Sequence, residues 1–199
     1  MALNTPSQAY RRYFNSLQAA VGCITHGRFT GRIAATPRVN QTYALVLNDG
    51  DPEPLKGRFR LAFSAGQEFR IIQDERADHG PYRATTIQYW YQFQVIDGVR
   101  LLTYHWTPET TDPGQRTYPH LHIESGLVDQ NGPFNPDTFS KYHIPTERIS
   151  IEAVVRFAIE ELGVEPISSN WESVLNRGQE VFNRHRWQGG ELREPDAER

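Results

Sequence analysis

The chain has 199 residues and a formal net charge of −3, with 38% hydrophobic and 23% charged residues. This length and composition predict one soluble globular domain with a real hydrophobic core. The small net charge gives no global reason to expect binding to nucleic acids or anionic membranes. The single cysteine, Cys23, excludes an internal disulfide and a multi-cysteine zinc site, and we expect it to be a buried small hydrophobic residue.

The N-terminal region predicts a helix and no targeting signal. No apolar run is long enough to span a membrane, and the first residues lack the pattern of a signal peptide, so we expect a cytoplasmic protein. Thr5 is a typical N-cap residue, Pro6 suits the first helical position, and Gly22 ends the pattern. An apolar stripe at helical spacing is expected to pack on a sheet: Tyr10, Tyr13, Phe14, Leu17 and Val21.

The central part of the chain predicts an antiparallel sheet. Strands are expected over residues 31–35, 41–47, 58–63, 68–73, 85–95, 99–106 and 118–123. Phe59, Leu61 and Phe63 are expected to share one face, and residues 64–67 are expected to form a turn. Asp97 and Gly98 form a two-residue hairpin turn between the two longest strands. Residues 74–81, 107–117 and 126–136 are predicted to be loops.

The strand at 85–95 has the clearest alternation of the sequence. Ile87, Tyr89, Tyr91, Phe93 and Val95 are expected on one face, and Gln88, Trp90, Gln92 and Gln94 on the other. An indole on this polar face can stack on a base or contact a partner. The simpler interpretation, which we favour, is that Trp90 packs under one of the terminal helices.

Two further helices are predicted near the C-terminus. Ser150 caps an apolar stripe that ends at Gly163, and Ser169 or Asn170 caps a last helix beginning near Trp171. A helix, then strands, then helices predict an α+β fold, with an antiparallel meander sheet, an N-terminal helix and two C-terminal helices. Residues 1–187 are expected to form one domain, and residues 188–199 a disordered tail.

The stretch from Tyr118 to His122 contains the candidate functional site. His120 and His122 are two residues apart in a predicted strand, so both rings should project from one face. His105 lies in the second arm of the predicted hairpin. If these two strands pair in the right register, three imidazoles converge on one side of the sheet.

Two kinds of chemistry would use such a histidine cluster. In the first, His120 and His122 act as general acid and base, while Arg116 or Arg148 stabilises an anionic phosphorane-like state. In the second, His105, His120 and His122 hold a divalent metal ion with one position open for water. A third interpretation is that these histidines only bond to neighbouring polar groups. The sequence lacks a phosphate-binding loop, a nucleophile elbow and a His-Glu-x-x-His helix, so it does not support those enzyme classes.

Several motifs in residues 85–162 resemble the TumE-type toxin family. They are, in chain order, Tyr89-Trp90-Tyr91-Gln92, Asp97-Gly98, Tyr104-His105-Trp106, Tyr118-Pro119-His120-Leu121-His122, and Pro145 followed by the helix that Ser150 begins. The family carries a Phe-Pro-His-His-x-His-like motif where this chain has Tyr118 and Leu121 in place of Phe and the middle His. These are small bacterial proteins assigned to the toxin side of toxin–antitoxin pairs.

The resemblance implies a bacterial context, a sheet topology and a site at His120 and His122. Our first hypothesis is therefore a toxin-like protein that acts on RNA or another phosphoester, with His105 and Arg116 assisting. The second is a non-catalytic module that forms a homodimer or binds a partner, and the third is a metal-binding protein. We expect no resident cofactor under the first hypothesis and a divalent metal under the third. An antitoxin protein and RNA are the expected partners, and whether the protein is an enzyme stays open.

Overall fold

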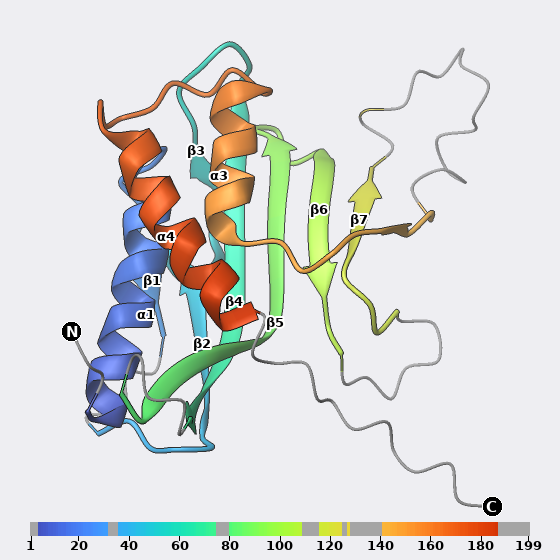
Figure 1. Ribbon diagram of the computed structural model, residues 1–199. Helices are drawn as coiled ribbons and strands as arrows, with labels where there is room; N and C mark the ends of the chain where they lie inside the picture. Colours follow the sequence, from blue (N-terminus) through green and yellow to red (C-terminus); the bar gives the residue numbers. More distant parts are fainter. Residues whose placement is uncertain are drawn as a thin grey trace, which may run out of the picture.

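Three α-helices and an eight-stranded sheet form the described part of the chain (Figure 1). The computed structural model describes residues 4–31, 36–74, 80–108, 116–124, 127 and 141–186, with the backbone alone at 184–186. The elements are α1 (Pro6–Val21), β1 (Phe29–Thr30), β2 (Thr42–Leu47), the 3₁₀ turn η1 (Asn48–Gly50), β3 (Glu53–Pro54), β4 (Leu61–Gln73), β5 (Tyr82–Val95), β6 (Arg100–Trp106), β7 (His120–Ile123), β8 (Ile144–Pro145), α3 (Ile151–Glu160) and α4 (Trp171–Arg186).

The strands follow one another across the sheet almost in chain order. The order is β1-β2-β4-β5-β6-β7-β8, with β3 paired to β4, and all these pairs are antiparallel. The three helices pack against one face of the sheet and leave β7 uncovered (Figure 1). This arrangement confirms the predicted α+β meander with one N-terminal and two C-terminal helices. None of the described helices is long and apolar enough to cross a membrane.

The predicted turn at residues 64–67 is wrong, because β4 is one continuous strand of 13 residues. Gly66 lies opposite Val46 of β2 on one side and opposite Trp90 of β5 on the other. Pairing on both sides satisfies the backbone N–H and C=O groups of this small polar segment, so tertiary context outweighs its turn composition. Phe59, expected in the same strand as Leu61, precedes β4 and is 50% exposed.

The alternation predicted for β5 breaks near its middle. The pairing with β4 shifts register between Glu68 and Phe69, so that Gln88 lies opposite Glu68 but Thr86 lies opposite Phe69. The extra residue on β5 forms a bulge, which changes the face of the residues before it. As a result, the hydroxyl of Thr86 reaches the hydroxyl of Tyr13 on helix α1, at 2.7 Å.

Other strand predictions have mixed outcomes. The predicted strand at 31–35 falls largely outside the described residues, as do most of the predicted loops at 107–117 and 126–136 and the tail at 188–199. The short strands β1, β3 and β8 were not predicted, because two-residue strands carry no periodicity. The predicted strand at 118–123 begins two residues later, at His120.

The aromatic stripe of α1 packs on the sheet as predicted. The ring of Tyr10 lies 5.4 Å from that of Tyr43 and 5.5 Å from that of Phe69, between centroids. Elsewhere on the same helix-covered face, Phe157 of α3 contacts Phe93, with ring centroids 6.4 Å apart. Cys23 is buried, also as predicted. These contacts make the helix-covered face of the sheet the hydrophobic core.

Loss of the α1 cap is expected to destabilise the protein modestly. The Thr5 side chain accepts a hydrogen bond from the Gln8 backbone, and the Gln8 side chain accepts one from the Thr5 backbone, so both sides of a capping box are present. Thr5→Ala should therefore cost about 1 kcal/mol of unfolding free energy. Chemical denaturation of Thr5→Ala and of Ser7→Ala, which keeps this capping box, would measure the difference. Equal stability of the two variants would contradict the role of the cap.

Candidate functional site

Strands β6 and β7 bring the predicted histidines together. In their antiparallel pairing, His105 lies directly opposite His120, and Thr103 lies opposite His122. Directly opposed residues share a face of the sheet, and so do residues two apart along a strand. One ligand atom from each imidazole lies within 4.8 Å of the other two. Strands β6 and β7 therefore pair in the register that the site predictions required, and the three imidazoles converge on one face of the sheet.

His120 is the most constrained member of the cluster, since it is only 1% exposed. Its Nδ1 lies 2.8 Å from the backbone oxygen of Tyr118. A carbonyl oxygen can only accept, so in the neutral ring Nδ1 carries the proton and Nε2 has the free lone pair. That Nε2 lies 2.9 Å from Nε2 of His122, which then donates this hydrogen bond. A backbone carbonyl on Nδ1 is the arrangement that orients histidines for metal binding through Nε2.

A fourth imidazole, that of His143, adjoins the cluster and was not predicted. Its ring centroid lies 4.8 Å from that of His120 and 4.5 Å from that of His122. Strand β8 holds it there, because Pro145 lies opposite His120. The Nδ1 of His143 is buried and has no hydrogen-bond partner among the described residues. No sequence spacing connected His143 to the other three, since it follows a long irregular segment.

The surroundings of His105 and His143 favour the neutral form of these two imidazoles. Burial lowers the pKa of His105, and the nearby rings of His120 and His143 lower it further. Burial also lowers the pKa of His143, as do the adjacent His120 and the guanidinium of Arg116. The neutral ring is the form of histidine that binds metal ions.

The two arginines considered as anion stabilisers lie in different places. Arg116 is exposed, and it is close enough to His143 to affect its pKa. Arg148 lies on the helix-covered side, where its Nη2 donates to the backbone oxygen of Thr86 at 2.8 Å. Its guanidinium also stacks on the ring of Trp106, 4.1 Å from the centroid. The charge of Arg116 therefore acts on a histidine next to the cluster, whereas Arg148 makes its contacts on the helix-covered side.

Trp90 lies beside the cluster, on the face of the sheet that points away from the helices. It is directly opposite His105 in the pairing of β5 with β6. Its indole covers Gly66, where an added Cβ would lie 2.4 Å from the indole Nε1. The next side chain, Tyr91, is hydrogen-bonded on the helix side of the sheet, and successive strand residues point to opposite faces. Trp90 therefore faces away from the helices, and the favoured packing under a terminal helix does not occur.

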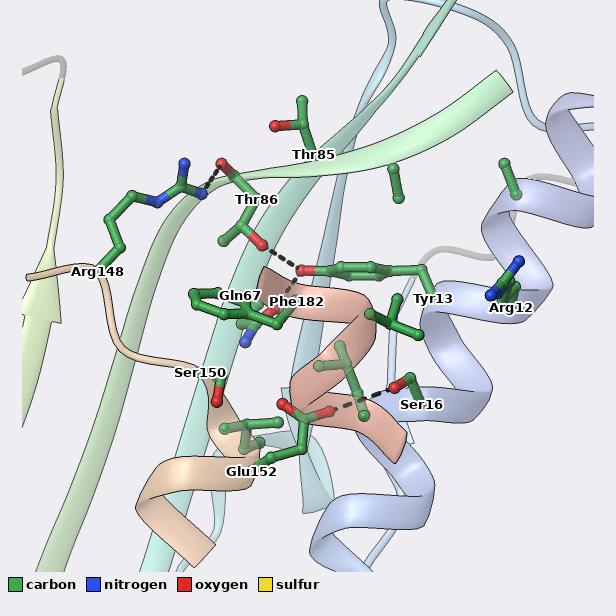
Figure 2. A pocket seen from close by; sticks show the side chains of 16 residues that line it. Arg12, Tyr13, Ser16, Gln67, Thr85, Thr86, Arg148, Ser150, Glu152 and Phe182 are labelled. Carbon is green, nitrogen blue, oxygen red and sulfur yellow. Dashed lines mark hydrogen bonds between the residues drawn. The ribbon is translucent and has the colours of Figure 1, made fainter. Parts of the chain in front are cut away.

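A second polar site, also not predicted, lies on the helix side. Residues of α1, β5, the start of α3 and α4 line a cavity of about 80 Å³ (Figure 2). Within it, the Tyr13 hydroxyl bonds to Gln67 and Thr86, and the Ser16 hydroxyl donates to Oε1 of Glu152 at 3.3 Å. Glu152 is 5% exposed. Burial raises the pKa of this carboxyl group, and hydrogen bonds from its own backbone and from Ser16 offset the rise only in part.

At pH 8, the Glu152→Gln variant is expected to be more stable than wild type. At pH 4, this difference in stability should be much smaller. Because the pKa of Glu152 is raised by folding, the folded protein binds this proton more tightly than the unfolded chain. Wild-type stability therefore falls as pH rises from the usual carboxyl pKa through the raised one, and stays lower above it. Melting temperatures of both proteins from pH 4 to 8 would measure the effect. Parallel pH profiles would contradict it.

Comparisons with known proteins do not assign the chain to a family. No protein-family model matches it, and neither a curated protein nor a solved structure does. The resemblance to TumE-type toxins therefore stays a prediction, and the geometry of the chain's own residues defines the candidate site.

Proposed function

We propose that this protein binds a divalent transition-metal ion through His105, His120 and His122. The observation that carries the proposal is the approach of three ligand atoms to within 4.8 Å of one another. Imidazole nitrogens bound to one zinc ion in a tetrahedral site lie roughly 3.4 Å apart. The Nε2 atoms of His120 and His122 are 2.9 Å apart, so small rotations of the two rings suffice to admit the ion.

The ligand set favours zinc and the neighbouring late first-row metals. The cluster contributes imidazole nitrogens, and within the described residues no carboxylate or thiol belongs to it. Magnesium and calcium prefer oxygen ligands, whereas imidazole suits zinc, copper, nickel and iron. The burial of His120 supports a ligand role as well, because a side chain that is 1% exposed has little contact with a substrate.

The reaction that we propose for this site is hydrolysis of a phosphoester, with RNA as a candidate substrate. With three protein ligands, a bound ion would keep a position for water and would lower the pKa of that water. Arg116 is exposed and its charge acts on His143, so in this proposal it would bind an anionic substrate near the cluster. His143 is a candidate fourth ligand or proton acceptor.

Metal content and affinity test the first step of this proposal. Wild type, His122→Ala and His26→Ala would be purified without immobilised metal, analysed for elements and titrated with zinc, nickel and magnesium. His26 is an exposed histidine outside the cluster, so its variant is the matched control. We expect one zinc or nickel ion per chain in wild type and control, and loss of binding in His122→Ala. Equal affinity in all three proteins would contradict the proposal.

The hydrogen bond between His120 and His122 favours a second candidate function, metal-independent cleavage of RNA or another phosphoester. One imidazole would act as base and the other as acid, with His105 and Arg116 assisting. This is the activity that we propose if the protein is a toxin of the TumE type. Growth inhibition and RNA degradation that persist with EDTA but are lost in His120→Ala and His122→Ala would support it. Equal behaviour of both variants and wild type would contradict it.

The face of the sheet that points away from the helices leads to a proposal about partners. We propose that an antitoxin protein or a second copy of the chain covers this face in the cytoplasm, where Trp90 lies opposite His105. Aromatic side chains are enriched at the centres of such interfaces. The mass in solution of wild type and Trp90→Ala tests the homodimer. If both proteins are monomers, the homodimer is contradicted, and a different protein remains as the proposed partner.

A further inference from the structure

A row of side chains across four strands connects Trp90 to the histidine cluster. Each member lies directly opposite the next, on β4, β5, β6 and β7 in turn: Gly66, Trp90, His105 and His120. Directly opposed residues share a face of the sheet, here the one opposite the three helices in Figure 1. Neighbouring strands are about 4.8 Å apart, so Trp90 lies about 10 Å from His120 along the row. An indole is therefore placed about the length of one nucleotide from the proposed metal site.

The indole of Trp90 lies over the sheet and is partly exposed. Gly66 makes this position possible, because an added Cβ there would lie 2.4 Å from Nε1 and 2.6 Å from Cε2 of the indole. Gln88 and Gln92, two residues to either side of Trp90, project from the same face. Side-chain amides of this kind can bond to the edge of a base that stacks on the neighbouring ring.

A second aromatic side chain, that of Tyr118, adjoins the cluster where β7 begins. It is 41% exposed, and its ring centroid lies 5.8 Å from that of His120. The backbone oxygen of Tyr118 is held by Nδ1 of the same histidine, at 2.8 Å. Exposed aromatic rings beside a path for the phosphate backbone are typical of proteins that bind single strands, since every base has a face that can stack. In a duplex, these faces are covered by the neighbouring bases.

We propose that the substrate class of the histidine site is single-stranded RNA. One base would stack on Trp90 and another on Tyr118, with a phosphate between them at the histidine cluster. This inference rests on the phosphoester hydrolysis proposed above, and it adds the part of the substrate that the protein recognises. Because the chain has a net charge of −3, stacking would contribute more to binding than charge does. With one or two phosphate contacts, the affinity should fall with salt at a logarithmic slope of only about −0.7 to −1.4.

Matched ligands test whether the protein recognises bases. Fluorescence anisotropy would measure binding of a labelled single-stranded RNA decamer, in EDTA and with 2′-O-methyl sugars so that the strand stays intact. An abasic decamer keeps every phosphate, and a duplex of the same sequence keeps the bases but stacks them on one another. We expect both to bind about tenfold more weakly than the single strand, or worse. Equal affinity for the single strand and either of these ligands would overturn the proposal.

Substitutions assign the stacking to the two rings. Trp90→Ala and Tyr118→Ala should each weaken binding of the single strand by about tenfold, and Trp90→Phe, which keeps an aromatic ring, should recover part of the loss. Phe59→Ala is the control, because Phe59 is 50% exposed but precedes β4, outside the row. Wild-type affinity in both alanine variants would overturn the proposal. If Trp90→Ala then changes only the mass in solution, this face binds protein and not RNA.

Zinc affinity of the same variants separates this proposal from that of the metal site. Neither Trp90 nor Tyr118 belongs to the ligand set, and alanine at position 118 keeps the backbone oxygen that orients His120. Both alanine variants should therefore bind zinc as tightly as wild type while they lose affinity for the single strand. Wild type that binds no zinc would contradict the metal site. Variants that bind zinc and the single strand as wild type does would contradict the stacking alone.

Discussion

Replacing His120 with alanine is expected to weaken the binding of zinc or nickel by roughly 100-fold or more. Among the three proposed ligands, His120 is the most deeply buried, and the backbone oxygen of Tyr118 fixes its Nδ1. Its removal leaves His105 and His122, which are half-buried, on two adjacent strands. Two imidazoles retain less affinity than three, and they lose the ligand that was already oriented. Competition with a chromophoric chelator at constant pH would measure the change.

The His143→Ala variant gives this prediction its sharpest comparison. His143 adjoins two of the proposed ligands but comes from β8, at the edge of the sheet. Its loss should weaken metal binding less than the loss of His120, provided that circular dichroism shows both variants folded. A larger loss of affinity in His143→Ala than in His120→Ala would contradict the proposed ligand set.

The layout of helices and strands was largely predictable because each element has a local cause. Thr5 and Ser150 accept hydrogen bonds from the first turns of their helices, and each is recognisable as a cap in the sequence. The hairpin between β5 and β6 forms as expected, but not through a two-residue turn at Asp97 and Gly98. The N–H of Gly98 donates to the backbone oxygen of Val95 at 2.9 Å, so Ile96 and Asp97 are the central residues of the turn, and Gly98 follows them at φ +92°. Residues 64–67 illustrate the opposite case. Their composition favours a turn, but all four pair with β5, and Gly66 and Gln67 also pair with β2. Such pairing partners cannot be deduced from the local sequence.

The histidine cluster could be predicted only as far as strands β6 and β7 and their pairing could be predicted. Residues two apart in a strand share a face, so the relation between His120 and His122 follows from the sequence alone. The position of His105 depends on register across a long connection, which spacing does not determine. His143 depends on a two-residue strand at the sheet edge, so its contribution emerges only from the structure.

The helix-side cavity could not have been predicted, since its polar groups come from distant parts of the chain. Ser16, Gln67 and Glu152 meet only after α1 and α3 pack on the sheet. The bulge in β5 adds to the difficulty. It turns Thr86 toward Tyr13, whereas uninterrupted alternation would place Thr86 on the opposite face.

Gly57 forms the junction between the sheet and the C-terminal end of α3. It lies in an isolated antiparallel bridge with Val164, and the neighbouring Arg58 N–H donates to the backbone oxygen of Gly163 at 3.0 Å. An added Cβ at Gly57 would lie 2.3 Å from that same oxygen and 2.8 Å from the Cα of Val164. Both atoms belong to the backbone, so no side chain can move aside. The φ of Gly57, +153°, is also one that other residues rarely adopt.

Gly57→Ala is therefore expected to destabilise the protein by about 3 kcal/mol, or roughly 6–12 °C in Tm. Gly98→Ala is the matched control, because Gly98 has φ +92° but nothing within 4 Å of an added Cβ. It carries the backbone strain without the collision, so it should cost only about 1 kcal/mol. Chemical denaturation of both variants would separate the two effects. Equal losses would mean that the connection between β3 and β4 moves away from α3 at little cost, and that this junction does not hold the helix layer on the sheet.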